Sequence, residues 1–423
     1  MTVRHQKSPP GAARRPVRGV PEFTSLAEFK NIAVEATRLV AAGRLPAGRK
    51  WDPEDHVTVL AYAWLRGVSV HVAAERLNEW AVRRGLHVPA EFADGRRSRA
   101  VPHQTSVNAW LRSLDLGAAQ ELARAVFGAA LRVGLRRGLV PRRVVLEYDL
   151  TYRGYWGARR DPFIKGSKMV KGTRRIRHYH AAMVHGGGVS LFVALEHVAK
   201  GRSKVPFLLS TARWLESLGL EVTWVLVDRE YYRHGVLAGL KGIGVDVVTP
   251  AVNHGPLKRA KLDYLLGRKG RVQRFSVGTG NRKGRKTLHH SCWLVLYPRG
   301  TQSLRAIRGA YRRGLLTLDE AAEQLYGLIT TAAPQRHGRS YPRTLRRLYK
   351  KRWQIESGFR DEDARRCPWS PDLDGVRPPD GPGRKVVHDA WRLDRASDPR
   401  GRRLTLQTFR DERVDAVTGQ FNL

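Results

Sequence analysis

The spacing of apolar residues changes near residue 139, and this change divides the chain more clearly than any other feature. Between about 22 and 138, apolar residues recur every three or four positions, which is the period of amphipathic helices. From 139 to about 250 they form short β-rich runs separated by helical stretches. The pattern predicts an all-helical domain over 22–138, followed by a mixed α/β (α+β) domain in which helices flank a mixed sheet.

The second domain is expected to alternate strands and helices and to extend over 139–360. Two of its strands are joined by Gly186-Gly187-Gly188, a run that is typical of a tight hairpin. The predicted strands are 144–150, 176–185, 189–198, 222–227 and 245–249, and the predicted helices are 205–218 and a segment near Val236.

A stretch rich in Gly, Lys and Arg is expected to form a β-rich insertion over about 251–330, with strands at 272–277 and 291–297. A capping-box sequence at 317–320 predicts the start of another helix. His289, His290 and Cys292 lie close together in the sequence, but a zinc site needs about four ligands and no partner pair is nearby. We therefore expect these three residues to be structural.

The charge of the chain points to a polyanionic partner. Lys and Arg total 77 and Asp and Glu 38, so the net charge is 77 − 38 = +39. Double-stranded DNA is the leading candidate, and a basic ribosomal or membrane-surface protein is the alternative. No apolar run reaches the length of about 18 residues that a membrane span needs. The two cysteines, Cys292 and Cys367, predict no disulfide framework and fit a reducing cytoplasm.

The helical domain begins with well-formed start signals. Asp52 and Pro53 predict a helix N-terminus, and Gly67 with Ser69 marks the end of that helix and the start of another. Two short helices joined by a Gly-containing turn resemble a helix-turn-helix, although ordinary helical packing gives the same pattern. Several nearby arginines favour DNA binding. The preceding residues 1–21 are expected to be a basic, disordered arm.

Three acids occur where separate elements could bring them together. Asp149 lies at the end of one predicted strand, Asp228 directly follows another, and Glu356 lies in a predicted helix. Two Mg²⁺ ions held by carboxylates can activate a nucleophile and stabilise the leaving oxygen of a phosphodiester. We expect these acids to bind two Mg²⁺ ions, with Mn²⁺ able to replace them. Glu147 and Glu230 are the nearest substitutes for the first two acids.

The segment around Glu356 carries a further pattern. In a helix, Tyr349, Arg352 and Glu356 share one face. The simplest alternative is that Glu356 only pairs with Arg352 one turn earlier, a surface contact worth about 0.3 kcal/mol.

These motifs together resemble those of a known family. Tyr349, Arg352 and Glu356 match the first three letters of Y-x2-R-x3-E-x6-K, and Asp228 is followed by an arginine and then aromatic residues. Asp149 is followed by Leu and Thr, as in the first acidic motif of the same family. The chain resembles the insertion-sequence DDE transposases, in the Y-R-E-K branch that has a β-strand insertion before the catalytic Glu.

The resemblance covers about 140–360 and implies an RNase H-like catalytic domain. It implies a DNA transposase that cuts transposon ends and joins them to target DNA, acting as a homodimer assembled on DNA in the nucleoid. It also implies DNA contacts by Tyr349, Arg352 and Trp353. A basic stretch is expected to contact the DNA backbone through Lys165, Lys168, Lys171, Arg174 and Arg175.

The chain departs from the family pattern near its C-terminus. The lysine of the motif would fall at position 363, where the residue is Asp363. The segment 361–423 contains 12 acidic and 12 basic residues and six prolines, so it is neutral, unlike the rest of the chain. A disordered extension and a frame-shifted tail both explain this change. Two further functions therefore stay open: a catalytically impaired DNA-binding relic or regulator, and an RNase H-like nuclease or resolvase without strand transfer.

Overall fold

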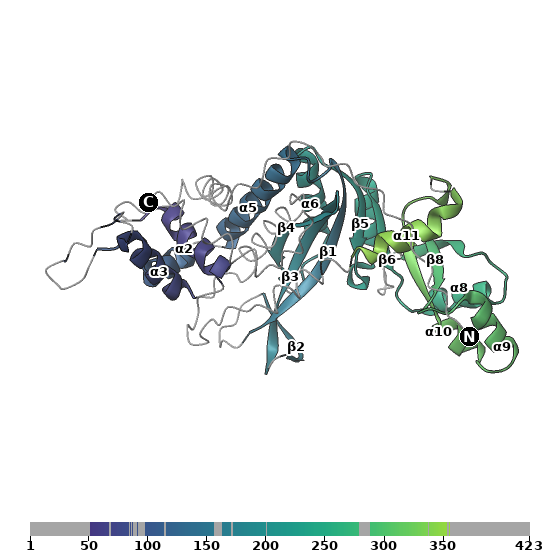
Figure 1. Cartoon of the computed structure of the whole chain (residues 1–423). Helices are drawn as coiled ribbons and strands as arrows, with labels where there is room; N and C mark the ends of the chain where they lie inside the picture. Colours follow the sequence, from purple (N-terminus) through teal and green to yellow (C-terminus); the bar gives the residue numbers. More distant parts are fainter. Residues whose placement is uncertain are drawn as a thin grey trace, which may run out of the picture.

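The computed structural model describes the chain from Trp51 to Ile355, with gaps. The described residues are 51–66, 69–83, 85, 87, 91, 98–113, 116–155, 163–170, 172–199, 201–278, 288–336, 338–352 and 355. The predicted basic arm, 1–21, and the predicted atypical tail, 361–423, lie outside them. The described elements form a helical region, a central sheet and a mixed insertion, arranged in a row (Figure 1).

The centre of the molecule is one mixed nine-stranded sheet. The sequence predicts a mixed sheet but not strands β2 and β9. Its strands are β1 (Arg143–Gly154), β2 (Ile164–Val170), β3 (Thr173–Gly186), β4 (Val189–His197), β5 (Glu221–Val227), β6 (Asp246–Pro250), β7 (Val272–Gly278), β8 (His289–Pro298) and β9 (Leu325–Thr330). The order across the sheet is β2-β3-β1-β5-β6-β9-β8-β7, and β4 also pairs with β3. The pairs β1/β5 and β5/β6 are parallel, and the other pairs are antiparallel.

The predicted hairpin joins β3 to β4. Its two turn residues, Gly187 and Gly188, have φ angles of +57° and +85°. Positive φ at both central positions is the geometry of the turn that matches strand twist, and glycine adopts it without steric cost. A Cβ atom on Gly187 would lie 2.7 Å from the backbone oxygen of Leu139, so this position also requires the absence of a side chain.

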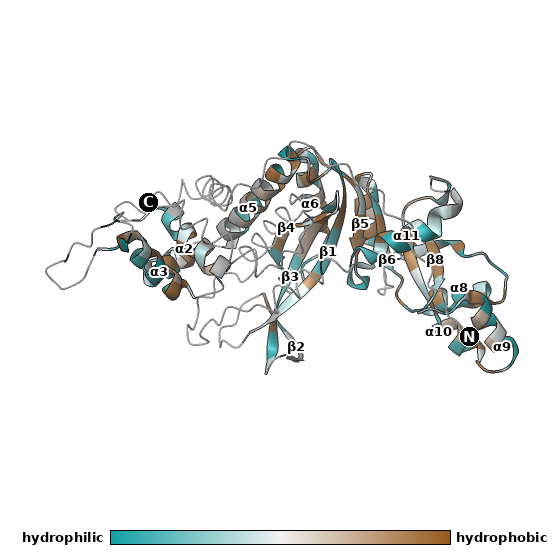
Figure 2. Ribbon diagram, viewed as in Figure 1, coloured by the Kyte–Doolittle hydropathy of each residue, from teal (hydrophilic) through white to brown (hydrophobic). Residues whose placement is uncertain are grey.

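One face of the sheet is covered by helices that follow the strands. Alternate residues of β1, including Val144, Leu146 and Tyr148, share a buried cluster with α6 (Val205–Ser217) and α7 (His234–Gly242). The Tyr148 hydroxyl donates to the Leu208 carbonyl at 2.7 Å, which satisfies a polar group inside this cluster. Hydrophobic and hydrophilic residues alternate with each other along the central strands, and the ends of β1 and β3 near β2 are the more hydrophilic (Figure 2).

The opposite face of the sheet is covered near β5 and β6 by α11 (Tyr341–Lys350). Leu345 and Leu348 of this helix are buried in a cluster with Val145, Leu226 and Val248. Strand residues two apart point to the same face, so Val145 defines the side on which Glu147 and Asp149 also lie.

The helical region consists of α2 (Pro53–Arg66), α3 (Val70–Arg83), α4 (Gln104–Ser113) and α5 (Leu116–Arg136). The Ser69 hydroxyl accepts from the Val72 N–H at 3.2 Å, so the predicted cap of the second helix is present. Leu60, Leu77 and Trp110 are buried together with Phe192 of β4. The helical region therefore packs against the sheet and shares a core with it.

The insertion contains more helix than the sequence predicts. It includes α8 (Gly255–Leu265), α9 (Leu304–Arg312) and α10 (Leu318–Glu323) in addition to β7, β8 and β9. The predicted capping box at Thr317 and Glu320 is formed at the start of α10. Strand β9 pairs with β6 as well as with β8, so the insertion strands continue the central sheet. No described helix has the length and apolar character needed to span a bilayer.

Candidate active site

Two of the three predicted catalytic acids lie side by side. The parallel pairing of β1 with β5 ends with Tyr148 opposite Val227. Asp149 follows Tyr148 and Asp228 follows Val227, so both acids lie at the carboxyl end of the parallel pairing between β1 and β5. Neighbouring strands are about 4.8 Å apart, and successive residues alternate between faces. The two carboxylates therefore extend from adjacent strands toward the face that carries Val145 and Leu226.

Strand β1 is longer than the sequence predicts. It continues to Gly154, because the residues from Leu150 to Gly154 pair with β3. Asp149 therefore lies inside a strand rather than at its end, and only the parallel half of its pairing stops there. A residue held in a ladder on one side has less freedom than one in a loop, which favours precise placement of its carboxylate.

Arg352 lies next to Asp149. Its Nη1 atom is 3.7 Å from Asp149 Oδ2, and the two side chains are only 15% and 14% exposed. The Arg352 guanidinium also lies 5.7 Å from the centre of the Tyr349 ring. The structure thus brings Arg352 of the sequence motif beside the first acid, with Tyr349 next to Arg352.

Charges of this group act on Tyr349. Burial raises the pKa of its hydroxyl, the Arg352 charge lowers that pKa, and the Asp228 and Glu147 carboxylates raise it. The hydroxyl therefore stays protonated at neutral pH and can donate a hydrogen bond. Because the charges of Asp228 and Arg352 both act on this pKa, the Tyr349 hydroxyl lies near both side chains.

The predicted helix around Glu356 is described only in part. Helix α11 ends at Lys350, and the N–H groups of Arg352 and Ile355 donate three residues back, at 3.1 and 3.4 Å. Ile355 is again helical. Glu356 and Trp353 lie outside the described residues, as does Lys171.

The two substitute acids have other partners. Glu147 is fully buried, and its Oε2 is 2.6 Å from His185 Nε2, while His185 Nδ1 is 2.8 Å from the Ser190 hydroxyl. Glu230 is exposed and lies 3.1 Å from the Lys204 ammonium. A carboxylate enclosed with an imidazole has no access to a substrate, so the geometry favours Asp149 over Glu147.

A second polar group adjoins the acids and is not apparent from the sequence. Burial is the main cause of the raised pKa of Tyr231, and the charges of Asp149 and Asp228 add to it. The Tyr231 hydroxyl is 2.9 Å from His180 Nδ1, and the Lys204 ammonium lies 4.8 Å from the ring centre. Only Tyr231, in the turn η1 (Arg229–Tyr231) after Asp228, had a sequence signal, as an aromatic residue next to the motif.

The basic residues of β3 lie at a distance from the acids, whereas Lys165 of β2 lies nearer to them. Arg174 and Arg175 are exposed on β3, seven and six residues before Ala181, the partner of Asp149. At about 3.4 Å per residue they lie roughly 20 Å along the strand. Lys165 on β2 is half-buried, and burial lowers its pKa, although Glu230 opposes the shift. Lys168 is in β2, but its side chain lies outside the described set.

A comparison with protein families finds a match that covers most of the sheet and the insertion. Residues 158–365 match the model of the transposase DDE domain. The chain carries a transposase DDE domain. The matched range contains Asp228, Tyr349, Arg352 and Glu356 and begins after β1, so it does not include Asp149.

Two solved transposase structures resemble the fold at a distance. One is a piggyBac transposase synaptic complex with hairpin DNA, with 11% identity and a TM-score of 0.46, covering 97% of this chain and 85% of that one. The other is a Drosophila P element transposase strand transfer complex, with 14% identity and a TM-score of 0.24, covering 57% of this chain and 50% of that one. Neither likeness assigns a role to a residue. No curated protein matches the sequence of this transposase-domain chain.

The described part of the acidic site suits a hard divalent cation. Asp149 and Asp228 offer only carboxylate oxygens, the ligands that Mg²⁺ and Mn²⁺ prefer. Both side chains are partly exposed, which leaves room for the water molecules that Mg²⁺ retains.

Proposed function

We propose that this transposase cuts DNA at the ends of a mobile element and joins the freed 3′ hydroxyl to target DNA. Asp149, Asp228 and Glu356 would hold two Mg²⁺ or Mn²⁺ ions. The observation that carries this proposal is the placement of Asp149 and Asp228 after the last paired residues of adjacent parallel strands. When bound, such ions activate the attacking oxygen and stabilise the leaving one.

The neighbouring side chains would orient the DNA. Arg352, beside Asp149, can present its guanidinium to a phosphate in a bidentate manner. The Tyr349 hydroxyl keeps its proton and can donate to a second phosphate oxygen. Arg352 contributes positive charge and Tyr349 a hydrogen-bond donor near two carboxylates that would otherwise repel a polyanion.

The rest of the chain would bind DNA without taking part in the chemistry. The net charge of +39 favours contacts to phosphate, and we assign Lys165, Arg174 and Arg175 of the β2–β3 hairpin to this role, with Lys168 and Lys171. We propose that the helical region recognises the transposon ends, that Trp353 contacts DNA near the cleaved end, and that two copies assemble on DNA.

Cleavage of end DNA in Mg²⁺ or Mn²⁺ tests the proposal. We expect Asp149→Asn, Asp228→Asn and Glu356→Gln to abolish cutting and to leave end binding intact. Glu230→Gln is the matched control, because this acid lies two residues from Asp228 but pairs with Lys204 on the surface. Cutting at the normal rate by any of the three acid variants would remove that residue from the site.

Pre-cut ends and a target plasmid separate the alternatives. A transposase joins the ends to the plasmid, whereas a nuclease or resolvase without strand transfer leaves them free. A catalytically impaired relic binds ends but neither cuts nor joins them. Asp363 and the neutral tail are the sequence features that favour such a relic, so the assay should include a copy with Asp363→Lys.

A further inference from the structure

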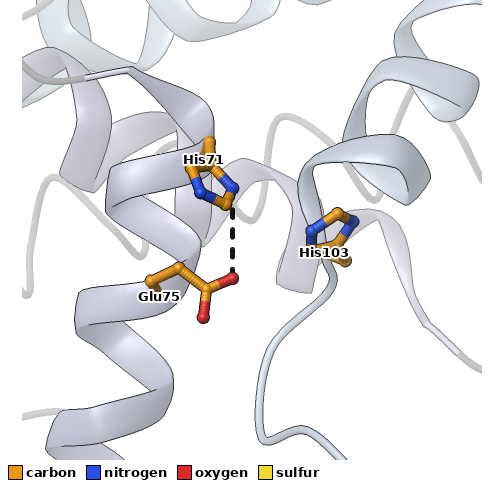
Figure 3. Close-up of side chains that lie close together, drawn as sticks. All are labelled: His71, Glu75 and His103. Atoms are coloured by element: carbon orange, nitrogen blue, oxygen red, sulfur yellow. Dashed lines mark ion pairs between the residues drawn. The ribbon is translucent and has the colours of Figure 1, made fainter. Parts of the chain in front are cut away.

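Two histidines and a glutamate meet in the helical region, far from the acidic site. His71 and Glu75 are one turn apart on α3, and His103 immediately precedes α4. His71 Nδ1 is 4.0 Å from Glu75 Oε1, and the rings of His71 and His103 are 6.0 Å apart. One ligand atom from each of the three residues lies within 4.8 Å of the others. The three side chains point into one space between the two elements (Figure 3).

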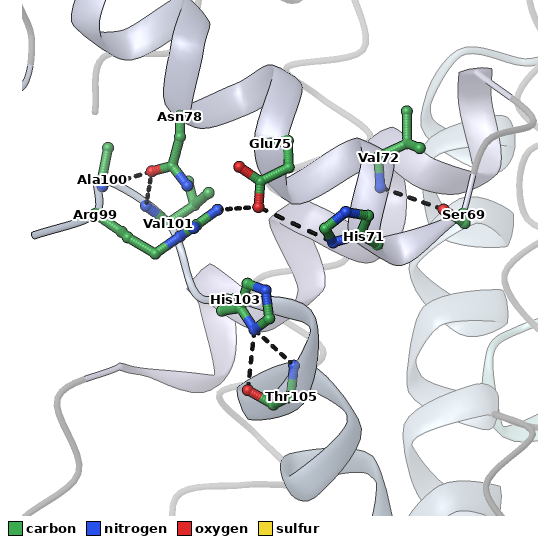
Figure 4. A network of polar contacts seen from close by, with 10 residues as sticks. All are labelled: Ser69, His71, Val72, Glu75, Asn78, Arg99, Ala100, Val101, His103 and Thr105. Carbon is green, nitrogen blue, oxygen red and sulfur yellow. Dashed lines mark hydrogen bonds and ion pairs between the residues drawn. The ribbon is translucent and has the colours of Figure 1, made fainter. Parts of the chain in front are cut away.

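The surrounding contacts hold this arrangement in place. Asn78 Oδ1 accepts from the N–H groups of Ala100 and Val101 at 2.7 and 3.2 Å, which fixes the segment before His103 against α3. Arg99 Nη2 lies 2.6 Å from Glu75 Oε1 (Figure 4). The two backbone segments that carry the ligands are therefore joined before any ion binds.

The contacts of His103 decide which of its ring nitrogens can bind a cation. Its Nδ1 accepts from the Thr105 N–H at 3.3 Å and lies 3.0 Å from the Thr105 hydroxyl. A cation would bind at Nε2, and the ring proton would then move to Nδ1 and be donated to the Thr105 hydroxyl.

The donor types and spacing suit zinc. Two imidazoles and one carboxylate form a common three-residue zinc set, with water as the fourth ligand. Bonds of about 2.0–2.1 Å in a tetrahedron place the ligand atoms about 3.3 Å apart, so the group must contract by roughly 1.5 Å at its widest. The His71 side chain is 54% exposed, so it can rotate inward without disturbing the core.

We propose that His71, Glu75 and His103 form a zinc site that ties α3 to the start of α4. The site would stabilise the helical region and would be separate from the acids on the sheet. It would take a borderline-soft divalent cation, because imidazole selects zinc, cobalt and nickel over magnesium.

Arg99 sets the strength of this site. Its guanidinium competes with a cation for Glu75 and adds a repulsive charge nearby. We therefore expect Arg99→Gln to tighten zinc binding severalfold. The alternative, in which Glu75 serves only to pair with Arg99, predicts no such gain.

Cobalt binding by the full chain tests the proposal, because tetrahedral Co²⁺ has a visible spectrum that reports its ligands. The titrations use a background with Asp149→Asn and Asp228→Asn, so that the acids on the sheet contribute nothing and the result is independent of cleavage. We expect one equivalent of Co²⁺ that Zn²⁺ displaces and Mg²⁺ does not. His71→Asn and His103→Asn should weaken binding by more than about tenfold, as loss of a direct ligand exceeds loss of an outer one.

His289→Asn is the matched control, since this exposed histidine on β8 lies outside the group. Circular dichroism of each variant shows whether the helices are retained. The proposal fails if His71→Asn and His103→Asn keep the spectrum and the affinity, or if the parent chain binds no Co²⁺ at all.

Discussion

The acidic site and the helical region each contain a carboxylate beside an arginine, and the two pairs differ in their surroundings. Asp149 and Arg352 are 14% and 15% exposed and lie 3.7 Å apart, next to Asp228. Glu75 and Arg99 are 38% and 28% exposed and lie 2.6 Å apart, next to two imidazoles. The same pair of charges can therefore belong to an oxygen-only site or to a nitrogen-rich one, and the neighbouring donors decide which cation fits.

The two regions also differ in how their side chains are held. Asp149 is fixed by hydrogen-bonded strands, whereas Glu75 projects from a helix surface. Changes at the sheet should therefore cause larger losses than matched changes in the helical region.

The largest expected effect is on catalysis. Asp228→Asn removes one of the two described carboxylates, and we expect it to lower the rate of end cleavage by about a thousandfold or more, the scale of losing a central electrostatic group. Glu75→Gln should leave that rate unchanged. Single-turnover cleavage of labelled end DNA measures both, and an equal loss in the two variants would mean that the regions are not separate.

Replacing a buried and a partly exposed glutamate by alanine shows how burial changes the loss in the free energy of unfolding. Glu147→Ala leaves buried His185 without its carboxylate partner, and we expect a loss of about 3 kcal/mol in the free energy of unfolding. Glu75→Ala breaks a partly exposed pair, and we expect at most about 1 kcal/mol without zinc. Urea unfolding monitored by tryptophan fluorescence gives both values. Equal losses would contradict the difference in burial.

Acid should weaken the sheet through His180. Burial is the largest cause that lowers its pKa from 6.5 to about 3. Between these two pH values the unfolded chain binds a proton that the folded chain does not, so stability falls as the pH falls. The loss reaches about 2 kcal/mol at pH 5, at about 1.4 kcal/mol per unit.

The variant His180→Gln tests this dependence, since glutamine cannot take up that proton. Unfolding measured from pH 7 to pH 5 should show a flatter profile for the variant than for the parent. A parallel pair of profiles would show that another group causes the acid sensitivity.

The smallest expected effect is the loss of stability on removing a helix N-cap, compared between two helices. The Ser69 hydroxyl caps α3 and the Ser303 hydroxyl caps α9, with N–H contacts of 3.2 and 3.1 Å. Ser→Ala at either position should cost about 1 kcal/mol. Only Ser69→Ala should also weaken Co²⁺ binding, because α3 presents His71. A similar loss of Co²⁺ affinity in Ser303→Ala would argue against a local effect.

Much of the sheet was predictable because its strands have clear local patterns. The runs that become β3 and β4 are separated by glycines, and the run that becomes β5 ends in the motif acid Asp228. Strand β9 was missed, since Leu325, Leu328 and Ile329 are all buried and their spacing shows no alternation. A short apolar run of this kind does not distinguish strand from helix.

The two candidate sites also differ in how far their residues can be predicted to meet from local sequence patterns. Asp149 and Asp228 each come at or after the end of a recognisable apolar strand run, so their proximity could be inferred from the sequence. His71 and Glu75 share a helical face, but His103 lies 103 − 75 = 28 residues beyond Glu75 and approaches only because Asn78 holds the chain before α4. Tertiary contacts of that kind leave no periodic signal in the sequence.

The strands β5, β6, β9, β8 and β7 are hydrogen-bonded in this order within one sheet, and this pairing fixes the distance between the two ends of the series. Four steps between neighbouring strands, at about 4.8 Å each, separate the ladder that ends at Asp228 from the outer strand that carries Arg274 by roughly 19 Å. If DNA contacted both places, the distance between the two contacts would stay constant unless a pair of neighbouring strands separated.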